Sequence, residues 1–310
     1  MGRVIGVFSG KGGVGKTTLV ANIATSLTKT FNKNVVVVDT NFSTSHLGMH
    51  FGLYEDPKVT LKDVVSRRSP IESAFYIHPT TGVRVLPAPL KQYTDDSVMR
   101  SLDVLAKKLK QDNDVVILDA APGLGKEVLS SIRSIDEAII VATPDLPSVT
   151  DAMKTVNIIK KVNSKANILG VVINRVTNEK HELTRKEIES ATNLSSIIEI
   201  PEDKRVPESI ALGQPAVHNF SNSEASIAYN YLSGALIGED YSPSGMRYGL
   251  RKMLGLTKKH IVRPPSLGKE REELERPAER KARQPEKSDG HGLKGRLNAK
   301  VSQKLRERGL

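Results

Sequence analysis

The chain has 310 residues, of which 38% are hydrophobic, enough for one large domain with a sizeable core and an appendage. It contains no cysteine, which excludes a disulfide framework, a cysteine-ligated zinc site and a thiolate-held iron–sulfur cluster. The whole formal net charge of +11 lies in residues 246–310, which contain 19 Lys and Arg and 8 Asp and Glu. Residues 1–245 contain 27 basic and 27 acidic residues. A neutral body with a basic tail predicts an anionic partner for the tail.

Short apolar runs alternate with amphipathic stretches along residues 1–242. The runs rich in Val, Ile and Leu, which predict strands, are 4–9, 35–39, 83–87, 115–119, 138–143, 168–174 and 197–200. The clearest helical patterns are 17–30, 97–110, 148–162 and 223–236. Nearly continuous apolar strands are typical of a sheet covered on both faces. We therefore expect an α/β fold with a mainly parallel twisted sheet flanked by helices, followed by a basic, partly disordered tail.

Two kinds of segment are not expected. The first predicted strand begins at residue 4, so we expect no signal peptide before it. No apolar stretch approaches the roughly 20 residues that span a bilayer. These observations predict a protein that is soluble or lies on a surface.

A phosphate-binding loop follows the first predicted strand and opens the first helix. Its residues are Gly10, Lys11, Gly12, Gly13, Val14, Gly15, Lys16, Thr17 and Thr18. They satisfy the pattern G-x-x-x-x-G-K-[ST] in the strand–loop–helix context that the pattern requires. Glycines let backbone N–H groups turn towards phosphate oxygens, and the helix presents its positive end to the same anion. We expect Lys16 to reach the β- and γ-phosphates and Thr17 to ligate Mg²⁺, whereas a ligand-free glycine turn is the weaker alternative.

Lys11 is a second lysine that the general pattern does not require. The run KGGVGKTT resembles the deviant Walker A motif of the MinD/ParA family of ATPases. In that family the extra lysine crosses a sandwich dimer and contacts phosphates bound by the other subunit. The resemblance thus implies an ATP-dependent homodimer in which Lys11, like Lys16, serves catalysis. The alternative for Lys11 is a solvated loop lysine.

Further residues are similar to the family pattern in order and spacing. Asp119 ends a buried strand like a Walker B aspartate, which implies that it holds Mg²⁺ through water. Gly123 resembles the switch II glycine that presents an N–H group to the γ-phosphate. By the same resemblance, Asn174 and Arg175 are the expected adenine contacts, and Pro201 and Asp203 belong to the loop that closes over the base.

The segment Asp39-Thr40-Asn41 departs from the family pattern. The family usually has Asp-x-Asp, and the second aspartate positions or activates the attacking water. Asp39 remains an expected metal ligand, but Asn41 can orient a water without accepting its proton. We expect slow hydrolysis that an Asn41→Asp substitution would accelerate; alternatively, Asn41 is a turn residue and a neighbour replaces the carboxylate. For His46 and His50, packing or surface roles are favoured over a metal site.

The tail contains a basic amphipathic segment, residues 243–262, before a charged and largely disordered stretch, 263–310. On a helix, Met246, Leu250, Met253 and Leu254 share one face with lysines and arginines outside it. Such a helix can lie in a membrane interface, and this segment resembles the membrane-targeting helix of MinD proteins. An ordinary helix packed on the body is the alternative.

The resemblance implies a MinD-like ATPase, cytoplasmic and peripheral at the inner face of the cell membrane. It would regulate the position of a division, motility or other polar machine, with an unidentified activating or cargo protein as partner. The rival is a ParA-like partitioning ATPase whose basic tail binds nucleic acid. A metal-cluster carrier of the same superfamily is disfavoured because cysteine is absent.

Overall fold

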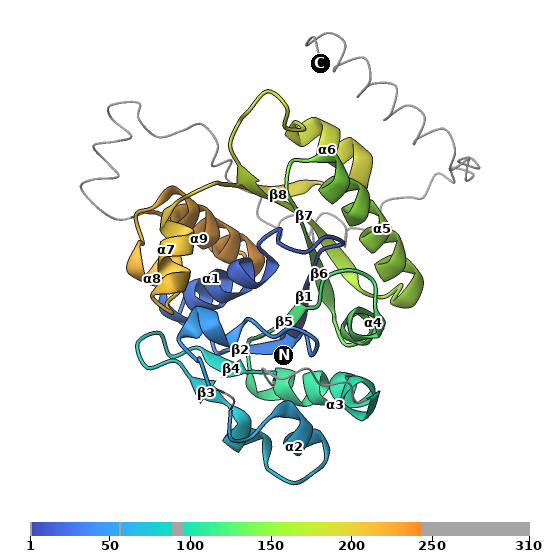
Figure 1. Ribbon diagram of the computed structural model, residues 1–310, viewed down its shortest axis with the longest axis vertical. Coiled ribbons are helices and arrows are strands. Elements are labelled where there is room, and N and C mark those ends of the chain that lie inside the picture. Colours follow the sequence, from blue (N-terminus) through green and yellow to red (C-terminus); the bar gives the residue numbers. More distant parts are fainter. Residues whose placement is uncertain (1, 56, 89–95, 244–310) are drawn as a thin grey trace. The chain divides into compact units, whose positions relative to one another are not determined.

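The computed structural model describes residues 2–55, 57–88 and 96–243. They belong to the first of two compact units of the chain, Met1–Lys269 (Figure 1). The predicted membrane residues Met246, Leu250, Met253 and Leu254 and the stretch 263–310 lie outside the described residues. Within the described ranges, no helix has the length and apolar character needed to cross a membrane.

An eight-stranded sheet forms the centre, in the order β3-β4-β2-β5-β1-β6-β7-β8. The strands are β1 (Arg3–Phe8), β2 (Val35–Thr40), β3 (Tyr76–Ile77), β4 (Arg84–Leu86), β5 (Val115–Ala120), β6 (Glu137–Ala142), β7 (Asn167–Val176) and β8 (Ser196–Pro201). All neighbours pair in parallel except β3 and β4. Seven of these strands match the seven predicted apolar runs. The eighth, β3, has two residues, too few to produce a periodic signal.

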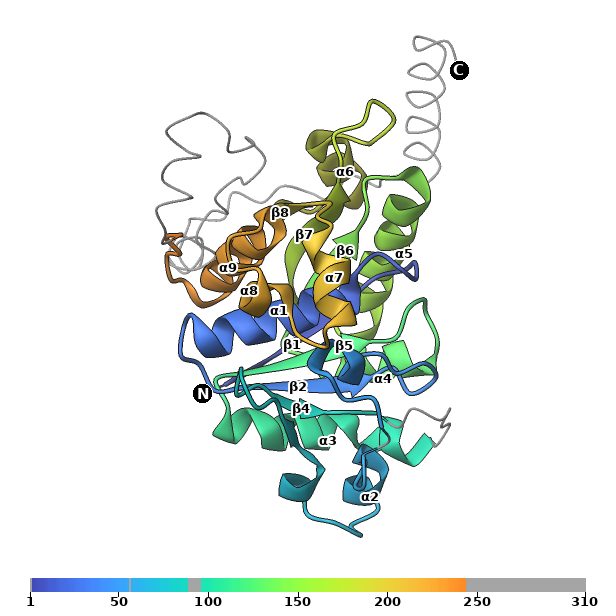
Figure 2. The same cartoon turned by 60° about the vertical axis from the view of Figure 1, so that its left-hand side comes forward.

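Helices cover both faces of the sheet. They are α1 (Lys16–Lys29), α2 (Leu61–Val65), α3 (Asp96–Asp112), α4 (Lys126–Arg133), α5 (Leu146–Val162), α6 (Arg185–Thr192), α7 (Arg205–Ala211), α8 (Ala216–Asn219) and α9 (Glu224–Ile237), with 3₁₀ turns η1 (Gly48–Phe51) and η2 (Ile71–Ala74). Figures 1 and 2 show α1, α7, α8 and α9 on one face and α3 to α6 on the other. The predicted α/β fold is confirmed, and the four predicted helices are α1, α3, α5 and α9.

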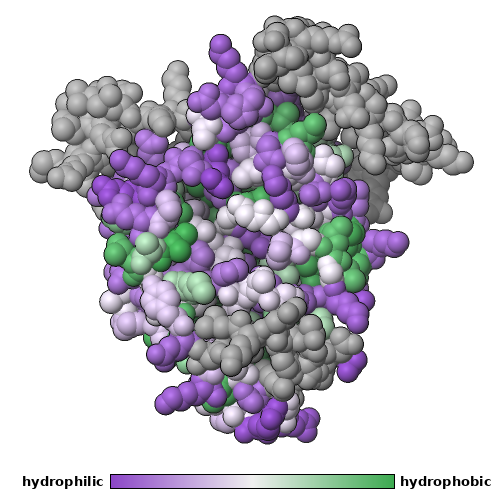
Figure 3. Space-filling view, in the orientation of Figure 1, coloured by the Kyte–Doolittle hydropathy of each residue, from purple (hydrophilic) through white to green (hydrophobic). Residues whose placement is uncertain are grey.

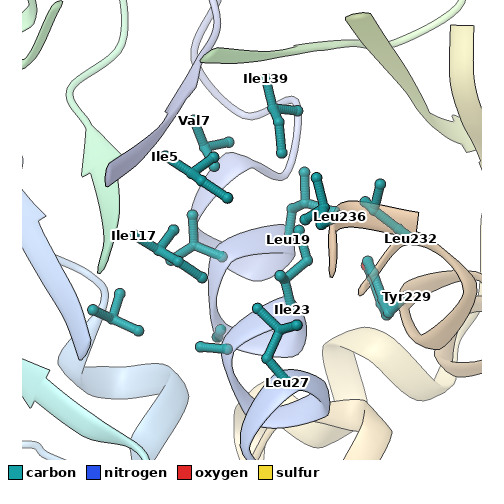
Figure 4. Close-up of a cluster of buried hydrophobic side chains, with 14 of the residues drawn as sticks. Ile5, Val7, Leu19, Ile23, Leu27, Ile117, Ile139, Tyr229, Leu232 and Leu236 are labelled. Carbon is teal, nitrogen blue, oxygen red and sulfur yellow. The ribbon is translucent and has the colours of Figure 1, made fainter. Parts of the chain in front are cut away.

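The core beneath α1 fixes the start of that helix. Leu19, Ile23 and Leu27 on α1 are buried between the central strands and α9 (Figure 4). The strands contribute Ile5, Val7, Ile117 and Ile139, and α9 contributes Tyr229, Leu232 and Leu236. Burial of aliphatic and aromatic side chains on this scale leaves α1 little freedom to shift. The loop that precedes α1 is therefore attached to a rigid element.

The strand order brings three polar segments to one edge of the sheet. β1 lies between β5 and β6, and β2 lies on the far side of β5. Because these strands are parallel, their carboxyl ends meet at the same edge, where ligands bind in open α/β sheets. Asp39 and Asp119 are register partners there, and Val7 of β1 pairs with Asp119 on its other side.

Candidate nucleotide site

The loop between β1 and α1 has the backbone of an open anion cradle. Gly13 and Gly15 lie in the left-handed region, with φ of 78° and 90°. A Cβ atom on Gly13 would meet nothing within 4 Å, whereas one on Gly15 would lie 2.3 Å from Asn174 Nδ2. Gly15 caps α1 without a side-chain hydrogen bond, and the first turn of α1 has no acidic residue. The first N–H groups of α1 are therefore directed at whatever enters the loop, which favours phosphate.

Asp119 supplies a buried carboxylate oxygen that is suited to bind a cation. Its Oδ1 is buried and has no hydrogen-bond partner within the described part of the chain. Burial raises the pKa of Asp119, while the charge of Lys16 and a hydrogen bond from the Thr17 hydroxyl act in the opposite direction. A carboxylate oxygen beside a threonine hydroxyl is the kind of ligand set that Mg²⁺ takes up. Lys16, Thr17 and Asp119 thus meet as the sequence predicts.

Asp39 lies next to Asp119 but is engaged by its own loop. Its Oδ1 accepts the Asn41 N–H group at 2.9 Å, and its Oδ2 accepts the Ser45 hydroxyl at 2.6 Å. Burial, followed by the charge of Asp119, raises the pKa of Asp39 to about 7. Both oxygens of Asp39 thus accept hydrogen bonds from the loop 41–45, and each keeps a lone pair for the metal role that the sequence predicts.

Asn41 makes its hydrogen bonds within the same loop. Its Nδ2 donates to the Thr44 carbonyl at 2.6 Å, and its Oδ1 accepts the Thr44 N–H group at 3.3 Å. The buried amide therefore holds a turn, which is the alternative that the sequence left open. In this conformation Asn41 is not free to orient a water molecule.

Lys11 is paired within its own chain. Its Nζ lies 3.3 Å from Oδ1 of Asp145, at the start of α5. The same carboxylate accepts the Ser148 N–H group as the N-cap of α5, and it also accepts the Thr143 hydroxyl. Partial burial raises the pKa of Asp145, but these hydrogen bonds, chiefly that from Thr143, outweigh it and hold the pKa below its usual value. Sequence reasoning did not identify Asp145; its position before a helix beginning Leu-Pro-Ser signals only a cap.

The predicted adenine residues lie beside the loop. Asn174 is buried at the end of β7, and its Nδ2 donates to the Val14 carbonyl at 2.7 Å. Arg175, with φ of 61°, pairs with Glu202 at 2.7 Å. Arg175 and Glu202 line an open cleft of about 570 Å³ together with Lys11 and the loop residues 12–14. The structure therefore brings Asn174 and Arg175 to the site.

The other predicted contacts are placed less directly. Gly123 has φ of 83°, in the left-handed region, and a Cβ atom there would meet nothing within 4 Å. Its N–H group donates to the Ser9 carbonyl at 3.3 Å in this structure. Pro201 ends β8 next to Val176 of β7. Asp203 uses its carboxylate to accept the N–H groups of Arg205 and Ala225, which ties α7 to α9. The structure thus gives Asp203 a bracing role.

His50 reaches the loop, although the sequence favoured packing. Its Nε2 lies 3.1 Å from the Thr18 hydroxyl and its Nδ1 lies 3.1 Å from the His46 carbonyl. Burial lowers the pKa of His50, although the hydrogen bond with the His46 carbonyl and the charge of Asp119 act in the opposite direction. In the described part of the chain, no group of three His, Cys, Asp or Glu residues could hold a metal ion.

Comparisons with known proteins identify a family of P-loop NTPases. The family model ParA, described as NUBPL iron-transfer P-loop NTPase, matches residues 1–237. An uncharacterized ATP-binding protein of Methanocaldococcus jannaschii is 36% identical over 242 residues, which cover 78% of this chain and 90% of that protein.

Solved structures of MinD share the fold. The cell division ATPase MinD of Pyrococcus furiosus gives a TM-score of 0.69 at 32% identity, covering 75% of this chain and 97% of that one. The septum site-determining protein MinD of Pyrococcus horikoshii, complexed with Mg-ADP, gives 0.69 at 30% identity, covering 76% and 96%. In the MinC:MinD cell division complex of Aquifex aeolicus, the matching chain gives 0.67 at 28% identity, covering 78% and 98%.

Proposed function

Since the chain belongs to the ParA/MinD family of P-loop NTPases, we propose that it is an ATPase that dimerises on ATP and acts as a spatial regulator at a membrane surface. One observation supports nucleotide binding in particular. Within the described residues, Oδ1 of Asp119 is buried beside Thr17 without a hydrogen-bond partner, next to the start of α1, which has no side-chain cap. The family model's description mentions iron transfer, but this sequence has no cysteine to hold iron.

The Asn174 amide favours adenine over guanine. The Val14 carbonyl only accepts hydrogen bonds, so the Asn174 Nδ2 must face it, which leaves Oδ1 as an acceptor and the second N–H of Nδ2 as a donor. An acceptor suits the 6-amino group of adenine and repels the 6-oxo group of guanine. The same hydrogen bond braces the loop, so base recognition and phosphate binding share one side chain.

The phosphates are assigned to residues of the loop and of β5. Lys16 carries the point charge for the β- and γ-phosphates, and no atom would lie within 4 Å of a Cβ built on Gly13 in the same loop. The Gly123 N–H group, which donates to the Ser9 carbonyl in this structure, would exchange that hydrogen bond for one to the γ-phosphate. Thr17 and Asp119 would hold Mg²⁺, which neutralises phosphate charge when it is bound. Because phosphoryl transfer depends mainly on positioning and charge, this set supports hydrolysis even though Asn41 is no proton acceptor.

Dimerisation is assigned to Lys11. The side chains of Lys11 and Asp145 are 45% and 39% exposed, so their ion pair is weak and exchangeable. A triphosphate on a second copy of the chain offers Lys11 a more highly charged partner. ATP binding would thus draw Lys11 away from Asp145 and across the interface.

Membrane attachment is assigned to residues 243–262 on sequence grounds alone. One short basic helix binds an anionic surface weakly, with about 1 kcal/mol from each basic residue. A dimer brings two such helices to the same surface, where the second binds at an effective concentration that can reach the millimolar range. Membrane attachment would therefore require bound ATP, and an activating or cargo protein would bind the dimer.

The decisive test measures nucleotide and surface together. A fluorescent ATP analogue should bind the wild type and fail to bind Lys16→Ala, which lacks the phosphate-facing charge. Wild-type protein should pellet with anionic liposomes in ATP and remain in solution in ADP. Equal pelleting in both would contradict the membrane switch, and ATP-dependent retardation of duplex DNA without pelleting would favour the ParA-like alternative.

A further inference from the structure

A hydrogen bond joins two loops beside the P-loop. The Ser43 hydroxyl, in the loop after β2, donates to Oε1 of Glu127 in the first turn of α4 at 2.7 Å. The two residues are 84 positions apart, and neither belongs to a motif of the nucleotide site. The contact therefore links the segments that follow β2 and β5.

The first loop, residues 41–45, is held internally. Asp39 accepts hydrogen bonds from its two ends, at Asn41 and Ser45. Asn41 fills the turn through its contacts with Thr44. With these groups engaged, the exposed Ser43 is left to contact the neighbouring loop. The loop is therefore held together by its own hydrogen bonds.

The second loop, residues 121–125, lies against the P-loop. The Gly123 N–H group donates to the Ser9 carbonyl at 3.3 Å. Pro122 is the nearest neighbour of a Cβ atom built on Gly12, at 3.9 Å. This loop connects Asp119 to α4, so a γ-phosphate bound at Gly123 would act on it directly.

A cavity of about 330 Å³ separates the two loops. It is lined by Asn41, Ser43, Thr44, Met99, Ala121, Pro122, Gly125, Lys126, Glu127 and Val128. Of these lining residues, Glu127 alone has a carboxylate. The Ser43–Glu127 hydrogen bond joins the two loops across this cavity. A buried hydrogen bond from the Ser131 hydroxyl of α4 to Thr40 Oγ1 at the end of β2 holds the bases of the same two segments together.

We propose that Glu127 is a positioning residue for ATP hydrolysis, which through Ser43 ties loop 41–45 to loop 121–125 so that both close on the γ-phosphate as one unit. The inference rests on the proposed ATPase function. Asn41 cannot adjust by itself, because its amide holds the turn, so the place of the whole loop decides how the attacking water is held. Misplacing a reacting group by about 1 Å can cost on the order of a hundredfold in rate.

Single and double variants test the link. Ser43→Ala and Glu127→Ala should each lower kcat by about tenfold to a hundredfold. The Kd for a non-hydrolysable ATP analogue should stay within about twofold, because neither residue faces the phosphates. The double variant should be no slower than the singles, since both remove one interaction. Ser43→Thr, which keeps the hydroxyl, should retain activity, and Asp103→Asn on the surface of α3 is the matched control.

Several results would overturn the proposal. These are an unchanged kcat in the single variants, a double variant slowed by the product of the two effects, or a loss confined to analogue affinity. If the wild type binds the analogue without hydrolysing ATP, the proposed ATPase function fails. Hydrogen exchange then tests whether Ser43 and Glu127 join the two loops. Analogue binding should protect residues 41–45 and 121–125 in the wild type and only 121–125 in Ser43→Ala; identical protection in both proteins would refute it.

Discussion

The ammonium group of Lys11 lies 3.3 Å from the carboxylate of Asp145, a residue 134 positions further along the same chain. The lysine that family resemblance assigns to a partner's nucleotide is therefore held in cis in this conformation. Asp145 also caps α5, so the ion pair connects the P-loop to the start of a helix on the opposite face of the sheet.

Asp145→Asn should favour the dimer. Asparagine keeps the cap on Ser148 but removes the charge that holds Lys11. Each exposed pair contributes up to about 1 kcal/mol and a dimer breaks two of them, which corresponds to an up to roughly thirtyfold lower protein concentration at half-dimerisation in ATP. Light scattering across a concentration series measures this. Asp103→Asn, which breaks an exposed pair with Lys107 on α3, is the control and should change nothing.

Lys11→Ala should separate nucleotide binding from dimerisation. The variant should bind an ATP analogue with wild-type affinity, because Lys16 and the loop backbone remain. It should stay monomeric in ATP, since no cation reaches across the interface. An ATP-dependent dimer of undiminished strength in light scattering would show that Lys11 has no role in trans.

Asn41→Asp should not accelerate hydrolysis, contrary to the expectation from sequence. The aspartate loses the Nδ2 donor to Thr44 and places a third carboxylate near Asp39 and Asp119. Loss of a buried donor costs about 1–3 kcal/mol. We expect a lower melting temperature and an equal or lower ATPase rate. A rate tenfold above the wild type at equal stability would restore the original interpretation of Asn41.

The contribution of Asp39 to the stability of the unliganded protein should fall as the pH rises through neutrality. The pKa of Asp39 is raised to about 7 in the fold, above its ordinary value near 3.8. Between these values the folded state binds more protons than the unfolded state, so the free energy of unfolding falls with increasing pH. Urea unfolding at pH 5, 6, 7 and 8 measures the slope. Asp39→Asn removes this contribution, so the slope of the variant should be more positive than that of the wild type, and equal slopes would contradict the raised pKa of Asp39.

Leu254→Glu should release the protein from membranes and leave nucleotide binding intact. The substitution puts a charge into the apolar face predicted for residues 243–262, where burial of an unpaired charge is unfavourable. Liposome pelleting in ATP compares the variant with the wild type. Leu293→Glu, outside the predicted face, is the control, and equal pelleting of Leu254→Glu and wild type would argue against the amphipathic helix.

The sequence by itself determined the structural features that depend on consecutive residues. The P-loop from Gly10 to Thr18 was identifiable because its glycines, lysine and threonine act through one continuous backbone turn. The seven long strands were identifiable because burial on both faces demands continuous apolar runs. The capping box of α6, formed by Thr184 and Glu187, also depends on neighbouring residues, but the helix is too short and too polar to show a clear hydrophobic periodicity.

The tertiary structure decided which side chains are free and which are engaged. The pairing of Asn174 with Val14, of Lys11 with Asp145 and of Asp39 with Asp119 joins residues 160, 134 and 80 positions apart. Such pairs depend on strand order and register, which hydrophobic periodicity does not specify. The role of Asn41 also depended on the tertiary structure. Its residue type suggests a group that orients water, but its amide donates to the carbonyl of Thr44, three residues further on, and this local hydrogen bond competes with any bond to solvent.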